Sequence, residues 1–192
     1  EVYLTGLELL MVMLAGVSLP RPEYNKMMKD LIVALKANGP RIKPKVRLLY
    51  TGGHADNPEF FELLQQNDAH VVSDNTGFGT RAADVLICED GDPLEAIINY
   101  YFEEKPAATR QMGTQVERME RLLDLVKQYK ADGVVASRLY MCDLWAFEHF
   151  LMRKRLHENN VPFLELEVDY TPEGQGQIKT RVQAFVESLA DR

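Results

Sequence analysis

Cysteine is scarce in this sequence, and no apolar run in it is long. Cys88 and Cys142 are the two cysteines among 192 residues. Two are too few for a disulfide framework, which favours a reducing compartment. The most apolar stretch, residues 7–19, is shorter than the about 20 residues that a membrane-spanning helix needs, and no leader pattern accompanies it. We therefore expect a soluble, cytoplasmic protein without a membrane partner.

Basic clusters are lacking as well. The sequence has 22 Lys and Arg against 29 Asp and Glu, a net charge of -7. No run of positive side chains offers a footprint for a phosphate backbone, so nucleic acid is not an expected partner. With 46% hydrophobic residues, the chain can bury one sizeable core but is too short for two ordinary domains.

Helical spacing of apolar residues fills the first part of the chain, and short strands alternating with helices follow. Residues 2–17 and 23–37 are predicted to form two antiparallel helices, which makes residues 1–40 a helical lead-in. Residues 41–192 are predicted to form an α/β domain with a parallel sheet. The predicted strands are 46–50, 70–72, 133–136 and 161–168, and the predicted helices are 58–66, 92–104, 114–129, 144–157 and 176–189.

The expected arrangement of these strands places particular loops at a ligand site. Right-handed crossovers favour the order 2-1-3-4, a three-layer, four-stranded, flavodoxin- or Rossmann-like fold. Such sheets bind ligands beyond the carboxyl ends of the strands where the winding direction reverses. Residues 51–54 and 138–142 follow the first and third strands, so His54 and Cys142 are expected at this edge.

Cys142 precedes a predicted helix, and the residues alone leave its role open. A helix N-terminus favours the thiolate, which attacks electrophiles and binds metals. A small buried hydrophobic residue is an equally consistent reading, because free cysteine is often buried. His54 could act as a base for a nucleophilic thiolate, whereas His149 is expected to face elsewhere. A metal site needs three or four ligands, and the chain offers one well-placed cysteine.

Several motifs together resemble the carboxyl-terminal domain of 2-hydroxyacyl-CoA dehydratase and benzoyl-CoA reductase subunits. The most specific are RLYMCDLW at 138–145 and GQGQIKTRVQAF at 174–185. VRLLYTG at 46–52, VVSD at 71–74 and DPLEA at 92–96 match less specifically. The resemblance covers nearly the whole chain.

The resemblance implies an oxygen-sensitive enzyme that passes one low-potential electron into an acyl-CoA thioester, with loss of water or ring reduction. In that family a 4Fe-4S cluster is held by three cysteines, and Cys142 matches the third. The other two belong to an amino-terminal domain. Because Glu1 opens inside an apolar run, we expect a carboxyl-terminal half of a longer subunit that is inactive alone. A second related subunit and an ATP-dependent electron-donating activator are the implied protein partners.

Four residues are candidates for contacts to the acyl-CoA substrate. The GQGQ run, which ends with Gln177, could cradle a coenzyme A phosphate with Lys179 or Arg181 assisting through charge, although glycines there are first of all a turn. His54 and Arg81 lie in loops expected at the ligand edge. Asp74 and its neighbours are expected mainly to form a turn after the strand.

One departure keeps other functions open. Gly77 stands where the family often has cysteine, which permits a non-catalytic partner domain of the same assembly. A flavodoxin-like module that binds a nucleotide or flavin is a further alternative. Cys88 is predicted to lie in the core, and three side chains are predicted to form the buried face of the helix after Cys142: Trp145, Phe147 and Phe150. Four methionines are predicted to pack between helices: Met11, Met13, Met27 and Met28.

Overall fold

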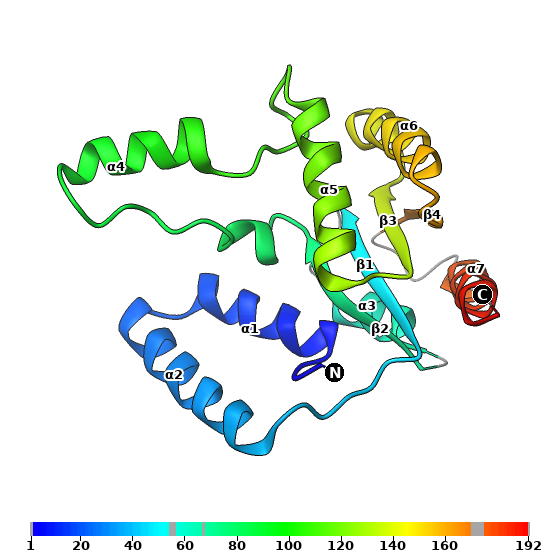
Figure 1. Cartoon of the computed structure of the whole chain (residues 1–192), viewed down its shortest axis with the longest axis horizontal. Helices are drawn as coiled ribbons and strands as arrows, with labels where there is room; N and C mark the ends of the chain where they lie inside the picture. The colour runs from blue at the N-terminus through cyan, green and yellow to red at the C-terminus, as the bar shows by residue number, and fades with distance from the viewer. Residues whose placement is uncertain (1, 54–56, 67, 170–174, 192) are drawn as a thin grey trace.

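A four-stranded parallel sheet organises the chain, with helices on both faces (Figure 1). The computed structural model describes residues 2–53, 57–66, 68–169 and 175–191. The strand order is β2-β1-β3-β4, which confirms the predicted order and the α/β class. The strands are β1 (Val46–Gly52), β2 (Ala69–Asn75), β3 (Gly133–Leu139) and β4 (Phe163–Val168). The helical elements are α1 (Gly6–Ser18), α2 (Arg21–Asn38), α3 (Pro58–Leu64), η1 (Thr80–Ala82), α4 (Pro93–Asn99), η2 (Tyr100–Glu104), α5 (Gln115–Tyr129), α6 (Asp143–Glu158) and α7 (Gln175–Ala190).

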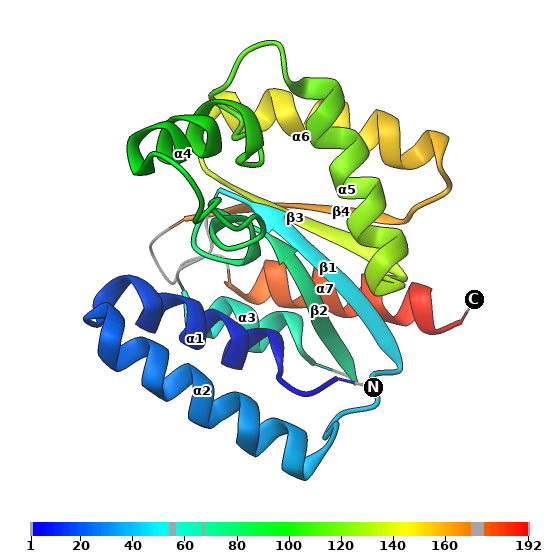
Figure 2. The same cartoon turned by 60° about the vertical axis from the view of Figure 1, so that its left-hand side comes forward.

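The alternation of side chains along β1 divides the core into two layers. Leu48 and Tyr50 are fully buried beneath α1, α3 and α7, whereas Leu49 is buried beneath α5 and α6. Figure 2 shows these two groups of helices on opposite faces of the sheet. A strand buried on both faces reads as a continuous apolar run, as VRLLY does.

The first helix begins four residues later than predicted. Val2 forms an antiparallel bridge with Ile42 instead. Thr5 sets the start of α1, because its hydroxyl accepts a hydrogen bond from the Glu8 backbone N–H at 3.1 Å while the Glu8 carboxylate accepts from the Thr5 N–H at 2.8 Å. This reciprocal capping satisfies two N–H groups that the helix cannot. Leu10 of α1 lies in the main core.

Several predictions of burial were wrong. Cys88 is exposed, as are Phe147 and Phe150. The buried face of α6 consists of Trp145, Glu148, His149, Met152 and Leu156, so the two phenylalanines project from the opposite face. Met11 of α1 and Met27 of α2 are also exposed, whereas Met13 and Met28 are partly buried. Among the described helices, none is both long and apolar enough to cross a membrane.

Candidate functional site

The carboxyl ends of β2, β1 and β3 lie side by side, and the loops that follow them form the candidate site. The loop after β3 is closed by a hydrogen bond from the Cys142 N–H to the Leu139 carbonyl at 3.1 Å. Met141 adopts a left-handed conformation with φ 62°. Cys142 then caps α6, with extended backbone angles of φ -88° and ψ 92°. The thiol therefore lies at a strand end and a helix N-terminus, as the sequence predicted.

Exposed apolar side chains flank Cys142 in the sequence. The thiol is free and half-buried, and Tyr140, Met141, Leu144 and Phe147 are all exposed, Met141 by 76%. A contiguous apolar patch on a protein surface commonly marks a ligand or protein contact. Cys142 also packs against the core layer that contains Trp145, so it lies partly buried at the edge of the core.

Trp145 fixes the start of α6 against the end of β1. A Cβ on Gly53 would lie 2.4 Å from the Trp145 Nε1, so no larger residue fits there without moving the indole. The Gly53 N–H also donates to the Ser137 carbonyl of β3 at 3.2 Å. Sequence reasoning missed this close approach, although the Gly-Gly pair after a strand was a signal for it.

Asp74 holds the turn after β2. Its Oδ1 accepts hydrogen bonds from the Thr76 N–H at 3.0 Å, the Thr76 hydroxyl at 2.7 Å and the Thr80 N–H at 3.2 Å. Burial raises the pKa of this carboxyl, and the hydrogen bonds oppose that shift. A Cβ on Gly79 would lie 1.9 Å from Oδ1, which only glycine avoids. The loop is therefore built by turn chemistry.

Arg81 projects from this turn toward α5. Burial lowers the pKa of its guanidinium, and the positive charge of Arg121 lowers it further. The group stays protonated because an arginine side chain keeps its charge in proteins. It makes no hydrogen bond or ion pair within the described part of the chain, and it lines a cavity of about 270 Å³ with Tyr101, Lys105 and Gln111. An anionic group would compensate this charge.

A buried ion pair behind the site joins α5 to α6. The Arg118 Nε lies 2.7 Å from the Glu148 Oε1, and the Arg118 Nη2 lies 2.8 Å from the Glu148 Oε2. The two side chains are only 7% and 3% exposed. Sequence reasoning missed the pair, because charged residues on amphipathic helices normally face solvent. No local pattern distinguished these two.

His149 is the other buried polar group of α6. Its ring is fully buried, makes edge contacts with Trp145 and Phe163, and has its Nδ1 3.4 Å from the Glu165 Oε1. Burial lowers its pKa. The prediction that it points away from the thiol loop agrees with this contact to β4.

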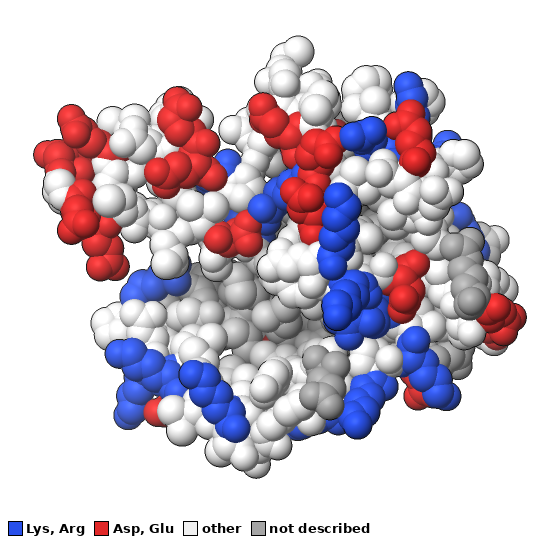
Figure 3. Space-filling model, viewed as in Figure 1, with Lys and Arg blue, Asp and Glu red and all other residues white. Residues whose placement is uncertain are grey.

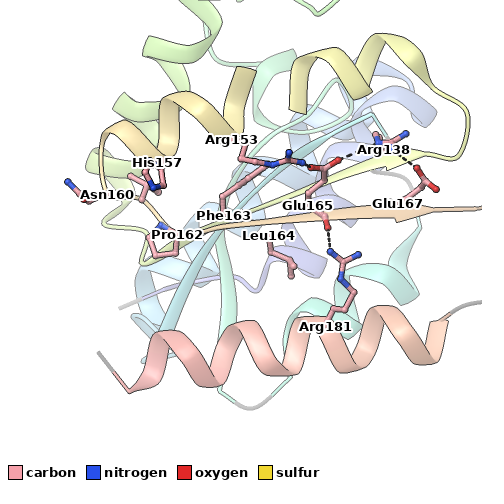
Figure 4. A pocket seen from close by; sticks show the side chains of 11 residues that line it. Arg138, Arg153, His157, Asn160, Pro162, Phe163, Leu164, Glu165, Glu167 and Arg181 are labelled. Atoms are coloured by element: carbon pink, nitrogen blue, oxygen red, sulfur yellow. Dashed lines mark hydrogen bonds and ion pairs between the residues drawn. The ribbon is translucent and has the colours of Figure 1, made fainter. Parts of the chain in front are cut away.

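Two of the remaining candidates, Gln177 and Arg181, belong to α7. Arg181 of α7 donates to the Glu165 carbonyl at 2.7 Å, on the open edge of β4. A cavity of about 780 Å³ lies there, lined by Arg138, Arg153 and other side chains (Figure 4). Gln177 is exposed near the start of α7. His54 lies outside the described residues.

Among the described residues, Cys142 lacks the neighbouring ligands that a metal ion needs. Across the described ranges, no group of three His, Cys, Asp or Glu side chains is placed to bind one. Cys142 fits the role of a single cluster ligand, since a thiolate is the group that iron–sulfur clusters use. Any further ligands would come from outside the described residues.

Comparison with known proteins gives one family and several relatives. The family model described as 2-hydroxyglutaryl-CoA dehydratase, D-component, matches residues 1–189. The chain is 29% identical to putative dehydratase subunit YjiM of Escherichia coli, over 79% of this chain and 39% of that protein. It is 24% identical to the (R)-phenyllactyl-CoA dehydratase beta subunit of Clostridium sporogenes and 21% identical to a benzoyl-CoA reductase subunit of Thauera aromatica, in each case over 93% of this chain and 47% of the relative. The chain thus spans less than half the length of these relatives.

Proposed function

The chain belongs to the 2-hydroxyglutaryl-CoA dehydratase D-component family, and we propose that it forms the α/β domain of one subunit of an iron-sulfur 2-hydroxyacyl-CoA dehydratase. The reaction removes water from a 2-hydroxyacyl-CoA thioester. A related ring reduction would use the same electron input. The observation that carries the proposal is the half-buried Cys142 thiol at the N-terminus of α6, beside an exposed apolar patch.

We propose Cys142 as one ligand of a 4Fe-4S cluster. Cys142 stands at the N-cap of α6, where its side chain makes no capping hydrogen bond and so remains available as a ligand. When bound, the cluster would supply a low-potential electron to the thioester. The protein's contribution here is to hold that sulfur in place, because Trp145 locks the first turn of α6 against Gly53.

The proposed substrate contacts divide into two groups. The exposed apolar side chains around Cys142 would cover the acyl chain and keep water away from the thioester. Arg81, which has a positive charge and a cavity in front of it, would bind an anionic group of the substrate,. His54 is proposed to approach from the loop after β1. Gln177 and Arg181 are proposed to contact coenzyme A from α7, although Arg181 already gives one donor to β4.

The relatives are named as beta subunits of dehydratases, which supports a second subunit for this chain. We propose that this subunit is related in sequence, that the pair is a cytoplasmic heterodimer, and that an ATP-dependent activator delivers the electron. These partners follow from the family and not from any contact seen in the structure.

Iron content tests the cluster assignment. The protein is produced without oxygen together with its partner subunit, and iron is measured in the wild type, in Cys142→Ser and in Cys88→Ser. We expect Cys142→Ser to lose most of the iron of this subunit and Cys88→Ser to retain it, because Cys88 is exposed on a different segment. Unchanged iron in Cys142→Ser would refute the assignment and favour a non-catalytic partner domain.

Thiol reactivity gives a test that needs no iron. Because Cys142 is half-buried at a helix N-terminus rather than sealed in the core, we expect it to be alkylated completely in the folded chain. Cys88 provides the reference rate for an exposed thiol. If Cys142 reacts only after denaturation, it is a small buried hydrophobic residue and not an accessible ligand.

A further inference from the structure

Arg81 and Lys105 line the same cavity, and among the described residues neither has an ion-pair partner. The cavity has a volume of about 270 Å³ and is lined by residues of η1, η2 and the loop of residues 105–114. The Lys105 Nζ lies 4.7 Å from the centre of the Tyr101 ring. This cation–π contact holds the ammonium group in place but does not neutralise its charge.

The other cations near Arg81 already have partners. Arg118 forms an ion pair with Glu148, and Arg121 forms one with Asp84. Burial and the positive charges of Arg121 and Arg118 lower the pKa of Arg81. A partly desolvated cation that lies near other cations is stabilised when an anion binds beside it.

Asp74 attracts Arg81, but its carboxylate is already used by the turn after β2. The Asp74 Oδ1 accepts hydrogen bonds from the Thr76 N–H, the Thr76 hydroxyl and the Thr80 N–H. Beside the guanidinium, Gly77 leaves space, because a Cβ there would lie 3.2 Å from the Arg81 Nη2. The donors of Arg81 therefore remain available to a group in the cavity.

The donors in the cavity fit a phosphate monoester better than a carboxylate. The Gln111 Oε1 accepts from the Ala108 N–H at 2.6 Å, which leaves the Nε2 donors of that amide for a ligand. Arg81 and Lys105 add two positive charges and further N–H donors. A phosphate monoester has three acceptor oxygens and a charge of about −1.5 to −2 at pH 7, whereas a carboxylate has two oxygens and a single charge.

The surface near the cavity is acidic, so any attraction for an anion must be local. The chain has a net charge of -7, and Figure 3 shows acidic side chains gathered over α4 and the segment that follows it. Long-range attraction therefore does not bring anions to this side of the molecule. An anion bound here would owe its affinity to the two unpaired cations of the cavity.

We propose that Arg81, Lys105 and Gln111 form a site for one phosphate monoester, and that this group is the terminal phosphate of coenzyme A. The choice of coenzyme A rests on the proposed function, whereas the choice of a phosphate monoester rests on the cavity. The phosphate would accept hydrogen bonds from Arg81 and Gln111 and lie beside the ammonium group of Lys105. This phosphate takes no part in the reaction, so the site would bind every acyl-CoA alike.

Dephospho-coenzyme A tests the assignment, because it lacks only the terminal phosphate. The protein is produced without oxygen together with its partner subunit, and the substitutions are made in this subunit alone. Isothermal titration calorimetry then gives the affinity and the number of sites for each form of the coenzyme. We expect the wild type to bind coenzyme A about tenfold or more tightly than dephospho-coenzyme A, because charge-assisted hydrogen bonds to the phosphate are lost in the second form.

Variants of the two cations show whether this preference comes from the cavity. In Arg81→Gln the preference for coenzyme A should fall below about threefold, and Lys105→Gln should reduce it in part. The control is Lys45→Gln, because Lys45 pairs with Asp68 before the start of β1, at the opposite end of that strand from the candidate site. It should keep the wild-type preference. Circular dichroism checks that every variant is folded.

Inorganic phosphate separates a site for the coenzyme from a site for the free anion. It should weaken the binding of coenzyme A to the wild type but leave the binding of dephospho-coenzyme A unchanged. Arg81→Gln should abolish this competition, since the phosphate site would be lost.

Three results would overturn the inference. Equal affinity of the wild type for both forms of the coenzyme would refute it and leave the proposed function standing. A preference for coenzyme A that survives in both Arg81→Gln and Lys105→Gln would place the terminal phosphate elsewhere. Binding of inorganic phosphate that depends on Arg81, with no binding of either coenzyme form, would assign the cavity to free phosphate and refute the proposed function as well.

Discussion

The buried ion pair between Arg118 and Glu148 allows a quantitative test of how the site is held. Both carboxylate oxygens accept from one guanidinium, at 2.7 and 2.8 Å. The remaining Nη1 donors reach the Thr114 hydroxyl at 2.6 Å, the Gln111 carbonyl at 3.1 Å and the Ala108 carbonyl at 3.2 Å. One arginine therefore joins α5, α6 and the loop of residues 105–114 that precedes α5.

Glu148→Gln removes the negative charge and leaves the guanidinium of Arg118 buried. Breaking a buried pair from one side costs about 3–5 kcal/mol, because the remaining charge is desolvated without compensation. Typical domains have only about 5–15 kcal/mol of total stability. We therefore expect Glu148→Gln to lose about 3–5 kcal/mol of unfolding free energy. The matched control is Glu120→Gln, because Glu120 pairs with Arg155 between the same two helices at 48% and 41% exposure. An exposed pair is worth about 1 kcal/mol at most.

Urea unfolding measures both changes. Trp145 is the one tryptophan of the chain and lies on α6, so its fluorescence reports on the helix that carries the pair, and circular dichroism checks the whole fold. The slope of unfolding free energy against urea should stay the same in all three proteins. Equal losses in the two variants, or a loss under about 1 kcal/mol for Glu148→Gln, would contradict the reasoning, since burial would then make no difference.

Two further predictions concern the turn after β2 and the buried imidazole. Gly79→Ala should lose about 1–3 kcal/mol in the same urea assay, because its Cβ would meet the Asp74 Oδ1 at 1.9 Å,. Gly77→Ala should change the unfolding free energy by less than about 0.5 kcal/mol, because the nearest atom to its Cβ is the end of the Arg81 side chain at 3.2 Å,. Equal losses in the two variants would show that the contact between the Gly79→Ala methyl group and Asp74 is relieved by a small shift. Burial lowers the pKa of His149 below its ordinary 6.5, so the unfolded chain takes up that proton first and stability falls as pH drops below 6.5. His149→Phe should remove the part of the stability loss between about pH 7 and 5 that comes from this imidazole. An unchanged pH profile would show that other groups cause the loss.

The sheet was predictable because its two central strands, β1 and β3, are buried on both faces. Such strands appear as short β-rich apolar runs between helices, and the crossover rule then leaves few orders to choose from. The position of Cys142 followed from the same rules, because the loop after β3 must lie at the carboxyl edge of the sheet. These rules place backbone, so they could fix the loop of Cys142 but not the exposed state of its neighbours.

The errors fall where apolar side chains are not covered by this chain. The apolar composition of residues 85–88 predicts that they lie in the core, yet Cys88 is exposed. Phe147 and Phe150 read as a buried face for the same reason. Periodicity shows that a side chain is apolar and where it repeats along a helix. It does not show whether its partner belongs to the same molecule or to another one.

Helix α6 shows the same effect on both of its faces. The inward face buries Glu148 and His149 among apolar side chains, and the outward face exposes Leu144, Phe147 and Phe150, so the helix departs from the usual pattern on both faces. Natural sequences break such rules mainly at functional sites. If a ligand or another protein segment covers the outward face, water leaves the surroundings of Cys142 and every charge interaction there becomes stronger. The exposed apolar side chains of α6 therefore give a physical reason to expect that a ligand or another protein segment covers this helix next to Cys142,.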